Sequence, residues 1–187
     1  IVWPISFGII LFGNELLYFW LGDLQMVNSI YYLVCFITIG CALNGVLSMI
    51  YMITIVHGNP KIFLYQNIII IFLMPFLLFF LVKQYGVIGA SVSWMLINLF
   101  SFIVMPFLTN SYVAKVNIRA WFLNDNLIPA SFSFLFIWLF SSINFDFDSS
   151  LMSSIFALLV ISSCTILLAL QSDIARNFIF KPRKIRS

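Results

Sequence analysis

Residues 62–82 read IFLYQNIIIIFLMPFLLFFLV, an apolar stretch between Lys61 and Lys83 that contains no charged side chain. At about 1.5 Å per residue, a helix of this length is roughly 30 Å long. The hydrocarbon core of a bilayer is also about 30 Å thick, so an apolar run of this length is typical of a membrane-spanning helix. The stretch therefore predicts that lipid, and not water, surrounds this part of the chain.

The rest of the sequence has the same character. The chain of 187 residues is 63% apolar and only 8% charged, whereas a soluble domain has roughly 25% charged residues. Backbone groups in lipid must pair within the segment, and alternating apolar and polar strands are absent, so we expect helices and no barrel. We predict an all-α integral membrane protein with about six transmembrane helices. The predicted spans are Ile1–Leu21, Ile30–Val56, Ile62–Val82, Val87–Leu108, Leu127–Phe145 and Leu151–Leu170.

The distribution of positive charge predicts an orientation. When the spans are threaded in order, Lys83 is the only one of the nine Lys and Arg residues on one side of the membrane. Cytoplasmic loops are enriched in Lys and Arg, so we place the side with the other basic residues, including the C-terminus, in the cytoplasm. The predicted outer loops are Asp23–Ser29, Lys83–Gly86 and Asn144–Ser150.

Two segments outside the spans carry most of this charge. Residues 109–126 are amphipathic if helical, with Val113 and Leu123 on one face and Lys115 and Arg119 on another, so we predict a cytoplasmic loop that lies along the membrane surface. The basic tail 171–187 is expected to meet anionic lipid. This division leaves four spans in 1–108 and two further spans in 127–170. Because the chain enters an apolar run directly at Ile1, we expect a fragment of a longer protein.

Polar side chains inside the spans indicate which faces avoid lipid. Steps of three and four residues align polar groups on one side of the second span, and do so again in the fourth. We expect both stripes to face the protein interior, either as ordinary helix packing or as the lining of a cavity. The stripes are Cys41, Asn44, Ser48 and Tyr51, and Ser91, Trp94, Asn98 and Ser101. The candidate substrate-pathway residues are Glu15, Asn44, Ser48, Gln66, Asn67, Trp94 and Asn98.

Further residues have candidate roles in ion coupling, bending and packing. Glu15 is the only acidic residue within an apolar run, roughly 9 Å below the end of its span at about 1.5 Å per residue. It could couple ion movement to transport, reach the interface beside Asn14, or pair with a helix outside this chain. Pro75 interrupts the third span and predicts a static kink or a hinge. The small residues Gly86, Gly89 and Ala90 permit close helix packing.

Signatures of soluble enzymes are missing. There is no GxxxxGK[ST] loop and only one histidine, His57, so we expect no enzyme activity, no metal and no cofactor. The three cysteines lack CxxC spacing, and no basic, aromatic-rich surface suggests nucleic acid. Asp146 and Asp148 form a pair that can hold a divalent metal, but a solvated turn between helices is the simpler interpretation. Membrane lipids are the expected partner.

Several motifs together resemble a known family over about Ile1–Leu108. They are GNELLYFWLG at 13–22, Gly40 with Asn44-Gly45, HGNPK at 57–61 and YGVIGASVSW at 85–94. In order and spacing they are similar to the C-terminal half of polysaccharide-unit flippases. These flippases belong to the MATE-like multidrug/oligosaccharidyl-lipid/polysaccharide exporter superfamily. The Arg that often follows the last motif is absent, because Trp94 is followed by Met-Leu-Ile-Asn.

The resemblance implies a transporter of two helical lobes with alternating access. Residues 1–108 would belong to the C-terminal lobe, and the spans in 127–170 would be accessory. The implied function is translocation of undecaprenyl-diphosphate-linked oligosaccharide repeat units across the bacterial inner membrane for O-antigen, lipopolysaccharide or capsule synthesis. The implied partners are this lipid-linked oligosaccharide and polysaccharide polymerase machinery. The alternatives are a drug or cation antiporter of the same superfamily, and a fragment of a membrane glycosyltransferase or polymerase that uses Asp146 and Asp148.

Overall fold

The computed structural model describes residues 2–113, 117–142 and 150–179. This part of the chain is 93% helical and contains no strand. Five of its helices are long and apolar enough to cross a membrane, which confirms the prediction of an all-α membrane protein. The helices are α1 (Val2–Leu11), α2 (Gly13–Leu21), α3 (Leu24–Val56), α4 (Lys61–Tyr85), α5 (Val87–Tyr112), α6 (Ile118–Ala120), α7 (Ile128–Ser141) and α8 (Ser150–Ile179), with the π-helix η1 (Trp121–Leu127) between α6 and α7.

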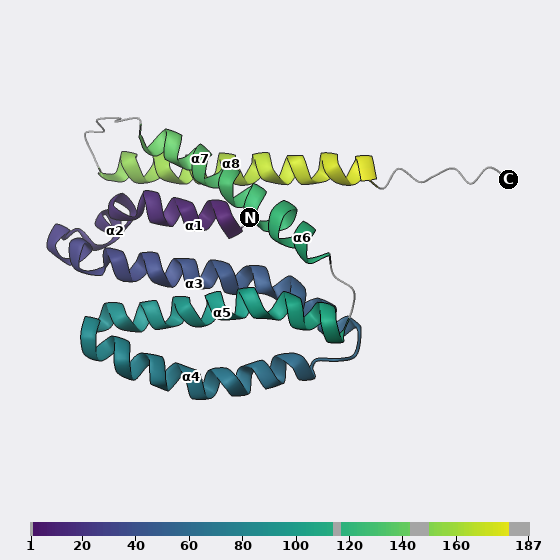
Figure 1. Ribbon diagram of the computed structural model, residues 1–187. Helices are drawn as coiled ribbons and strands as arrows, with labels where there is room; N and C mark the ends of the chain where they lie inside the picture. Colours follow the sequence, from purple (N-terminus) through teal and green to yellow (C-terminus); the bar gives the residue numbers. More distant parts are fainter. Residues whose placement is uncertain (1, 114–116, 143–149, 180–187) are drawn as a thin grey trace.

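The long helices lie side by side in one layer (Figure 1). From one edge to the other the order is α4, α5, α3, α1, and then α7 with α8. The α2–α3 and α4–α5 connections lie at one end of the layer, while the α3–α4 connection and the start of α6 lie at the other. Two apolar clusters hold the layer together: Leu47, Ile50, Met105 and Trp121, and Phe12, Ile137, Ala157, Val160 and Cys164.

The first predicted span is not one straight helix. It breaks at Phe12, and α1 and α2 are bent by 71° relative to each other. The end of α1 leaves carbonyl groups without partners in their own helix, and the Tyr31 hydroxyl of α3 donates a hydrogen bond of 2.7 Å to one of them, the oxygen of Ile10. Gly13 lies at the bend, where an added Cβ would be 2.9 Å from the Tyr31 ring. The break therefore depends on a contact with another helix.

The loop predicted at Asp23–Ser29 is mostly helical. α2 ends at Gly22, whose φ of 70° is the left-handed conformation that glycine favours. Asp23 then serves as the N-cap of α3, because its carboxylate accepts hydrogen bonds from the backbone N–H groups of Gln25 and Met26. The helix consequently begins at Leu24, six residues earlier than the predicted span.

The predicted loop 109–126 differs in a similar way. α5 continues to Tyr112, and residues 118–127 are helical and run directly into α7, so that Ile118–Ser141 forms a single candidate span. Asn117 caps this segment by accepting a hydrogen bond from the N–H of Ala120. Trp121 is buried against the α3–α5 cluster, which fixes the start of the span well before residue 127. Asp146, Asp148 and the end of the basic tail lie outside the described residues.

Candidate functional site

The polar stripe of α3 does not lie inside the helix layer. Cys41, Asn44, Ser48 and Tyr51 are all exposed, so no described helix packs over this stripe. That the stripe faces the protein interior, as the lining of a cavity, stays a prediction. The buried face of α3 is the one that carries Gly40, Leu43, Leu47, Ile50 and Thr54, which also follow steps of three and four residues.

Close packing at Gly40 explains this choice of face. A Cβ on Gly40 would lie 2.6 Å from Cδ1 of the Trp94 ring and 3.2 Å from Cα of Met95. The absence of a side chain thus allows α5 to approach α3 along the Gly40 face. The polar stripe is one residue further along the helix, roughly 100° around the axis at 3.6 residues per turn. It therefore flanks the α3–α5 contact and faces away from it.

Asn44 differs from the rest of this stripe in combining a mid-membrane depth with an amide that has no hydrogen-bond partner among the described residues. It lies about 18 Å from the Val56 end of α3 at ~1.5 Å per residue, close to the middle of a hydrocarbon core about 30 Å thick. Ser48 donates a 2.7 Å hydrogen bond to the carbonyl of Gly45, whereas the Asn44 amide has no partner among the described residues. An amide without a partner in hydrocarbon costs about 2–7 kcal/mol. This face of α3 is therefore suited to meet water, a polar ligand or other polar side chains.

The stripe on α5 is buried apart from Trp94, in contrast. Ser91, Asn98 and Ser101 are 2%, 4% and 3% exposed, and Ser91 and Asn98 each donate a hydrogen bond within their own helix. Ser91 donates to the carbonyl of Ile88 at 2.7 Å, and Asn98 donates to the carbonyl of Trp94 at 2.8 Å. Trp94 is partly exposed and packs on Gly40. This stripe therefore serves helix packing.

Gln66 and Asn67 lie near the start of α4. Gln66 is the buried residue of α4, and its Nε2 donates to the hydroxyl of Ser101 on α5, while its Oε1 is buried without a hydrogen-bond partner. Asn67 is exposed on the neighbouring face. The two amides, adjacent in sequence, therefore have opposite environments.

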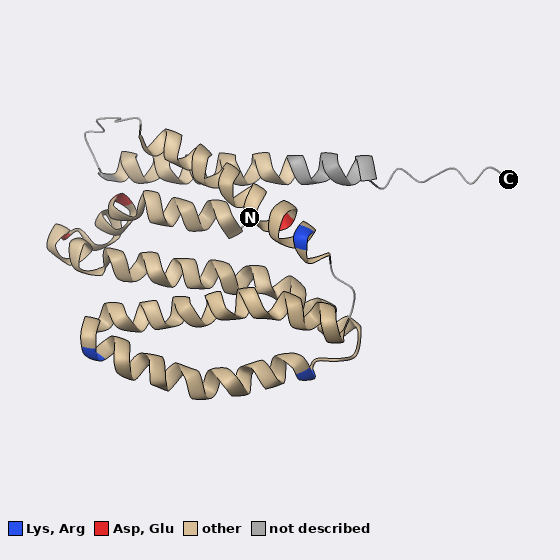
Figure 2. Cartoon of the chain, in the orientation of Figure 1, with Lys and Arg blue, Asp and Glu red and all other residues tan. Residues whose placement is uncertain are grey.

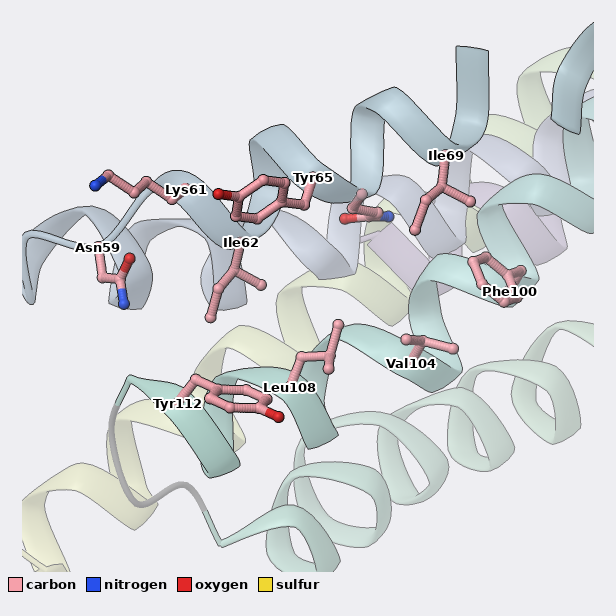
Figure 3. A pocket seen from close by; sticks show the side chains of 10 residues that line it. Asn59, Lys61, Ile62, Tyr65, Ile69, Phe100, Val104, Leu108 and Tyr112 are labelled. Atoms are coloured by element: carbon pink, nitrogen blue, oxygen red, sulfur yellow. The ribbon is translucent and has the colours of Figure 1, made fainter. Parts of the chain in front are cut away.

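A cavity of about 410 Å³ separates α4 from α5 at the Lys61 end of α4. Figure 3 shows Lys61 and Asn59 at one end of it and Ile69 and Phe100 at the other. Of the residues that line this cavity, only Gln66 is among the substrate-pathway candidates predicted from the sequence. The cavity is lined by Asn59, Lys61, Ile62, Tyr65, Gln66, Ile69, Phe100, Val104, Leu108 and Tyr112.

Glu15 occupies a different position from the one predicted. It is exposed in the first turn of α2, where a carboxylate interacts favourably with the helix dipole. The predicted depth assumed a straight span, but the 71° bend turns α2 away from the direction of α1. The estimate of roughly 9 Å below the end of the span, which used a rise of 1.5 Å per residue, therefore does not apply.

The residues expected to bend or pack helices gather around α4. Pro75 is exposed in the middle of α4, which is curved there without a break (Figure 1). Gly86 has a φ of 58° and forms the turn into α5. At Gly89 a Cβ would lie 2.1 Å from the backbone oxygen of Leu81, so this glycine is where α4 and α5 approach closely. Ala90 is half-buried beside it.

Charged residues are few and lie toward helix ends in the described part of the chain (Figure 2). Within it, no group of three or more His, Cys, Asp or Glu residues could hold a metal ion. Comparison with protein-family models, with curated proteins and with solved structures finds no match to this chain.

Proposed function

We propose that this chain forms one wall of a transporter that moves an undecaprenyl-diphosphate-linked oligosaccharide across the bacterial inner membrane, for surface polysaccharide synthesis. The observation that carries the proposal is the exposed amide of Asn44 near mid-membrane depth, with the Ser48 hydroxyl one turn away. A helix face in contact with lipid alone would not present these groups. The resemblance of residues 1–108 to polysaccharide-unit flippases supplies the substrate.

The chemistry of such a substrate suits this face. Sugar hydroxyls and a diphosphate cannot cross hydrocarbon unless other polar groups replace their water. An asparagine side chain offers two N–H donors and a carbonyl acceptor, and a serine hydroxyl can donate and accept. The protein makes no covalent bond in this process. It exposes the polar face to each side of the membrane in turn, by movement of one lobe against another.

The single layer of helices also supports a role as one part of a larger assembly. The polar face of α3 lies on a broad side of the layer and is not enclosed by the described helices. A path for a charged, hydrated substrate must be shielded from lipid all round. We therefore assign the opposite wall of the path to further helices. The polymerase machinery would act on the translocated units.

We also propose that the C-terminal end of the chain lies on the cytoplasmic side of the membrane. Lys61 and Lys83 lie at opposite ends of α4 (Figure 2) and do not favour either direction. Lys115 lies in the connection after α5, Arg119 lies in α6, and the C-terminal tail carries five Lys and Arg residues. By the positive-inside rule this distribution favours the cytoplasm for that end.

The alternatives have less support. A cation antiporter needs a protonatable acid in the membrane path, but Glu15 lies in the bent α2 and not on the α3 stripe. A glycosyltransferase would use Asp146 and Asp148, which are outside the described residues.

The test is complementation of a strain that lacks its polysaccharide-unit flippase, with surface glycan as the readout. The complete gene should restore export. Asn44→Leu should lower export at least about tenfold, the effect of losing roughly one polar contact in the rate-limiting step. Met49→Leu is the control, because Met49 is an exposed apolar residue of the same helix, 65% exposed, and this variant should export normally.

Two outcomes would contradict the proposal. Normal export by Asn44→Leu at normal membrane levels would show that the polar face of α3 does not line the substrate path. Full export by residues 1–187 alone would show that no further helices are needed to enclose it.

A further inference from the structure

The first two helices are too short to cross the membrane together. α1 has 10 residues and α2 has 9, so their lengths are roughly 15 Å and 14 Å at a rise of 1.5 Å per residue. Because they are bent by 71° relative to each other, α2 adds only about 4 Å along the direction of α1. The pair therefore covers roughly 20 Å of a hydrocarbon core about 30 Å thick. α2 runs closer to the membrane plane than to the direction of the spans.

The length of α3 indicates the depth of the bend. The Tyr31 hydroxyl contacts the carbonyl of Ile10 just before the bend, and Tyr31 precedes Val56, the last residue of α3, by 25 residues. This separation is roughly 37 Å at 1.5 Å per residue. The hydrocarbon core is about 30 Å thick, and the bilayer with its head groups about 40–45 Å. With Val56 at one boundary of the core, the bend and α2 lie in the head-group region of the other side, at one end of the helix layer (Figure 1).

α2 is amphipathic in a way that suits this position. Leu16 is half-buried and packs against the apolar cluster of α7 and α8, so this side of α2 faces the membrane-spanning helices. At 3.6 residues per turn, Trp20 and Phe19 lie about 40° and 60° from Leu16 around the helix axis. Asn14 and Glu15 lie about 160° and 100° from it and form the polar side. The two aromatic rings are therefore on the side of α2 that faces the bilayer.

This apolar side is only partly covered by protein. Trp20 is 78% exposed and Phe19 is 53% exposed. α2 packs on α3 and α8, which are both candidate spans, so the exposed rings continue the lipid-facing surface of these helices. Tryptophan is enriched at membrane interfaces, where its ring meets both hydrocarbon and polar head groups. Lipid is therefore the partner that fits this surface.

The charge of α2 limits the kind of lipid. Glu15 is its only charged residue and is exposed, and Asp23 follows in the turn to α3. Surface helices that depend on anionic lipid carry Lys and Arg on their polar side, and α2 has neither. Its attraction to the membrane comes from the apolar area of the two rings. A zwitterionic lipid surface is sufficient for this interaction.

We infer that α2 is an interfacial anchor that binds a zwitterionic lipid surface. Phe19 and Trp20 insert between the lipids, while Asn14 and Glu15 remain in contact with water. Interfacial aromatic residues set the tilt and rotation of the spans to which they are attached. α2 thus fixes the depth of α1 and α3 at this side of the membrane.

The experiment is spin labelling of single cysteines in the complete protein, in phosphatidylcholine vesicles and a background without other cysteines. Nitroxide labels report accessibility to oxygen, which concentrates in hydrocarbon, and to a water-soluble nickel chelate. The label at Phe19→Cys, which retains Trp20, should prefer oxygen and lie about 5–10 Å deep. The label at Glu15→Cys should prefer the nickel chelate. Phe72→Cys, near the middle of α4, is the reference and should be deeper than Phe19→Cys.

A second comparison tests whether Trp20 holds α2 at this depth. Trp20→Ser, combined with Phe19→Cys, should shift the preference of the label toward the nickel chelate, because the largest exposed apolar group of α2 is lost. Trp138→Ser is the matched control, since Trp138 is 47% exposed on α7, and it should leave the label unchanged. Addition of phosphatidylglycerol to the vesicles should also leave the label of the unaltered helix at the same depth.

Four outcomes would overturn the inference. Equal accessibility of Phe19→Cys and Glu15→Cys to nickel would place the whole helix in water. A label at Phe19→Cys that is shielded from both reagents would show that protein covers this side. Insertion only in the presence of phosphatidylglycerol would show that anionic lipid is required, and equal effects of Trp20→Ser and Trp138→Ser would exclude an anchor at Trp20. The proposed transport function would survive each result, since it depends on the α3 face and is scored by glycan export.

Discussion

Gly40 determines which face of α3 meets α5. A Cβ at this position would be 2.6 Å from the Trp94 ring, whereas a Cβ at Gly45 would have only an ordinary contact of 3.5 Å with Val2. Both glycines belong to the motifs on which the resemblance rests, but only Gly40 lies in a tight helix crossing. The same contact turns Asn44 outward while Asn98 on α5 is buried.

The two glycines give a matched pair for mutagenesis. Gly40→Ala should destabilise the protein by about 1–3 kcal/mol, because an extra methyl in a well-packed contact forces its neighbours apart. Gly45→Ala should be neutral or slightly stabilising, since alanine favours helix more than glycine does. Thermal unfolding in detergent, followed by circular dichroism, measures both. Equal midpoints for the two variants would show that the Gly40 crossing does not determine the α3–α5 contact.

The break between α1 and α2 shows how one helix shapes another. The Tyr31 hydroxyl reaches the carbonyl of Ile10 across 21 residues of sequence, so the bend at Phe12 is held by α3. Hydrophobic periodicity could not predict it, because residues 1–21 are mostly apolar on both sides of the bend and Gly13 alone is compatible with a continuous helix. The N-cap of α3 at Asp23 could have been predicted from the sequence, since an Asp before an apolar run is a common signal for the start of a helix.

Removal of this hydroxyl tests the break. Tyr31→Phe should lower the free energy of unfolding by about 1 kcal/mol, the typical net contribution of a hydrogen bond. Tyr32→Phe is the control, because Tyr32 is 61% exposed and its hydroxyl has no hydrogen bond in the structure. Chemical denaturation of both variants in the same detergent gives the comparison. A larger loss for Tyr32→Phe would contradict this explanation of the bend.

Much of the fold follows from the sequence, but less of the site does. Length and hydropathy predicted the all-α membrane class and the cores of the long helices, because lipid demands uninterrupted apolar helices. Periodicity predicted that the polar side chains of α3 share one face. It could not predict that this face is exposed, since that depends on the α3–α5 crossing. Periodicity could not predict the cavity at Lys61 either, because the walls of this cavity come from two helices.

The central claim is that the polar face of α3 lines a water-accessible path through the membrane. Single cysteines at two positions of similar depth test it: Asn44→Cys, about 18 Å from the Val56 end of α3, and Phe72→Cys, about 17 Å from the Lys61 end of α4 at ~1.5 Å per residue. Both are introduced into the complete protein after replacement of Cys35, Cys41 and Cys164. A charged, water-soluble methanethiosulfonate reagent modifies the thiolate, which forms only in contact with water. The account predicts rapid modification of Asn44→Cys and none of Phe72→Cys in native membranes, and equal reactivity of the two cysteines would contradict it.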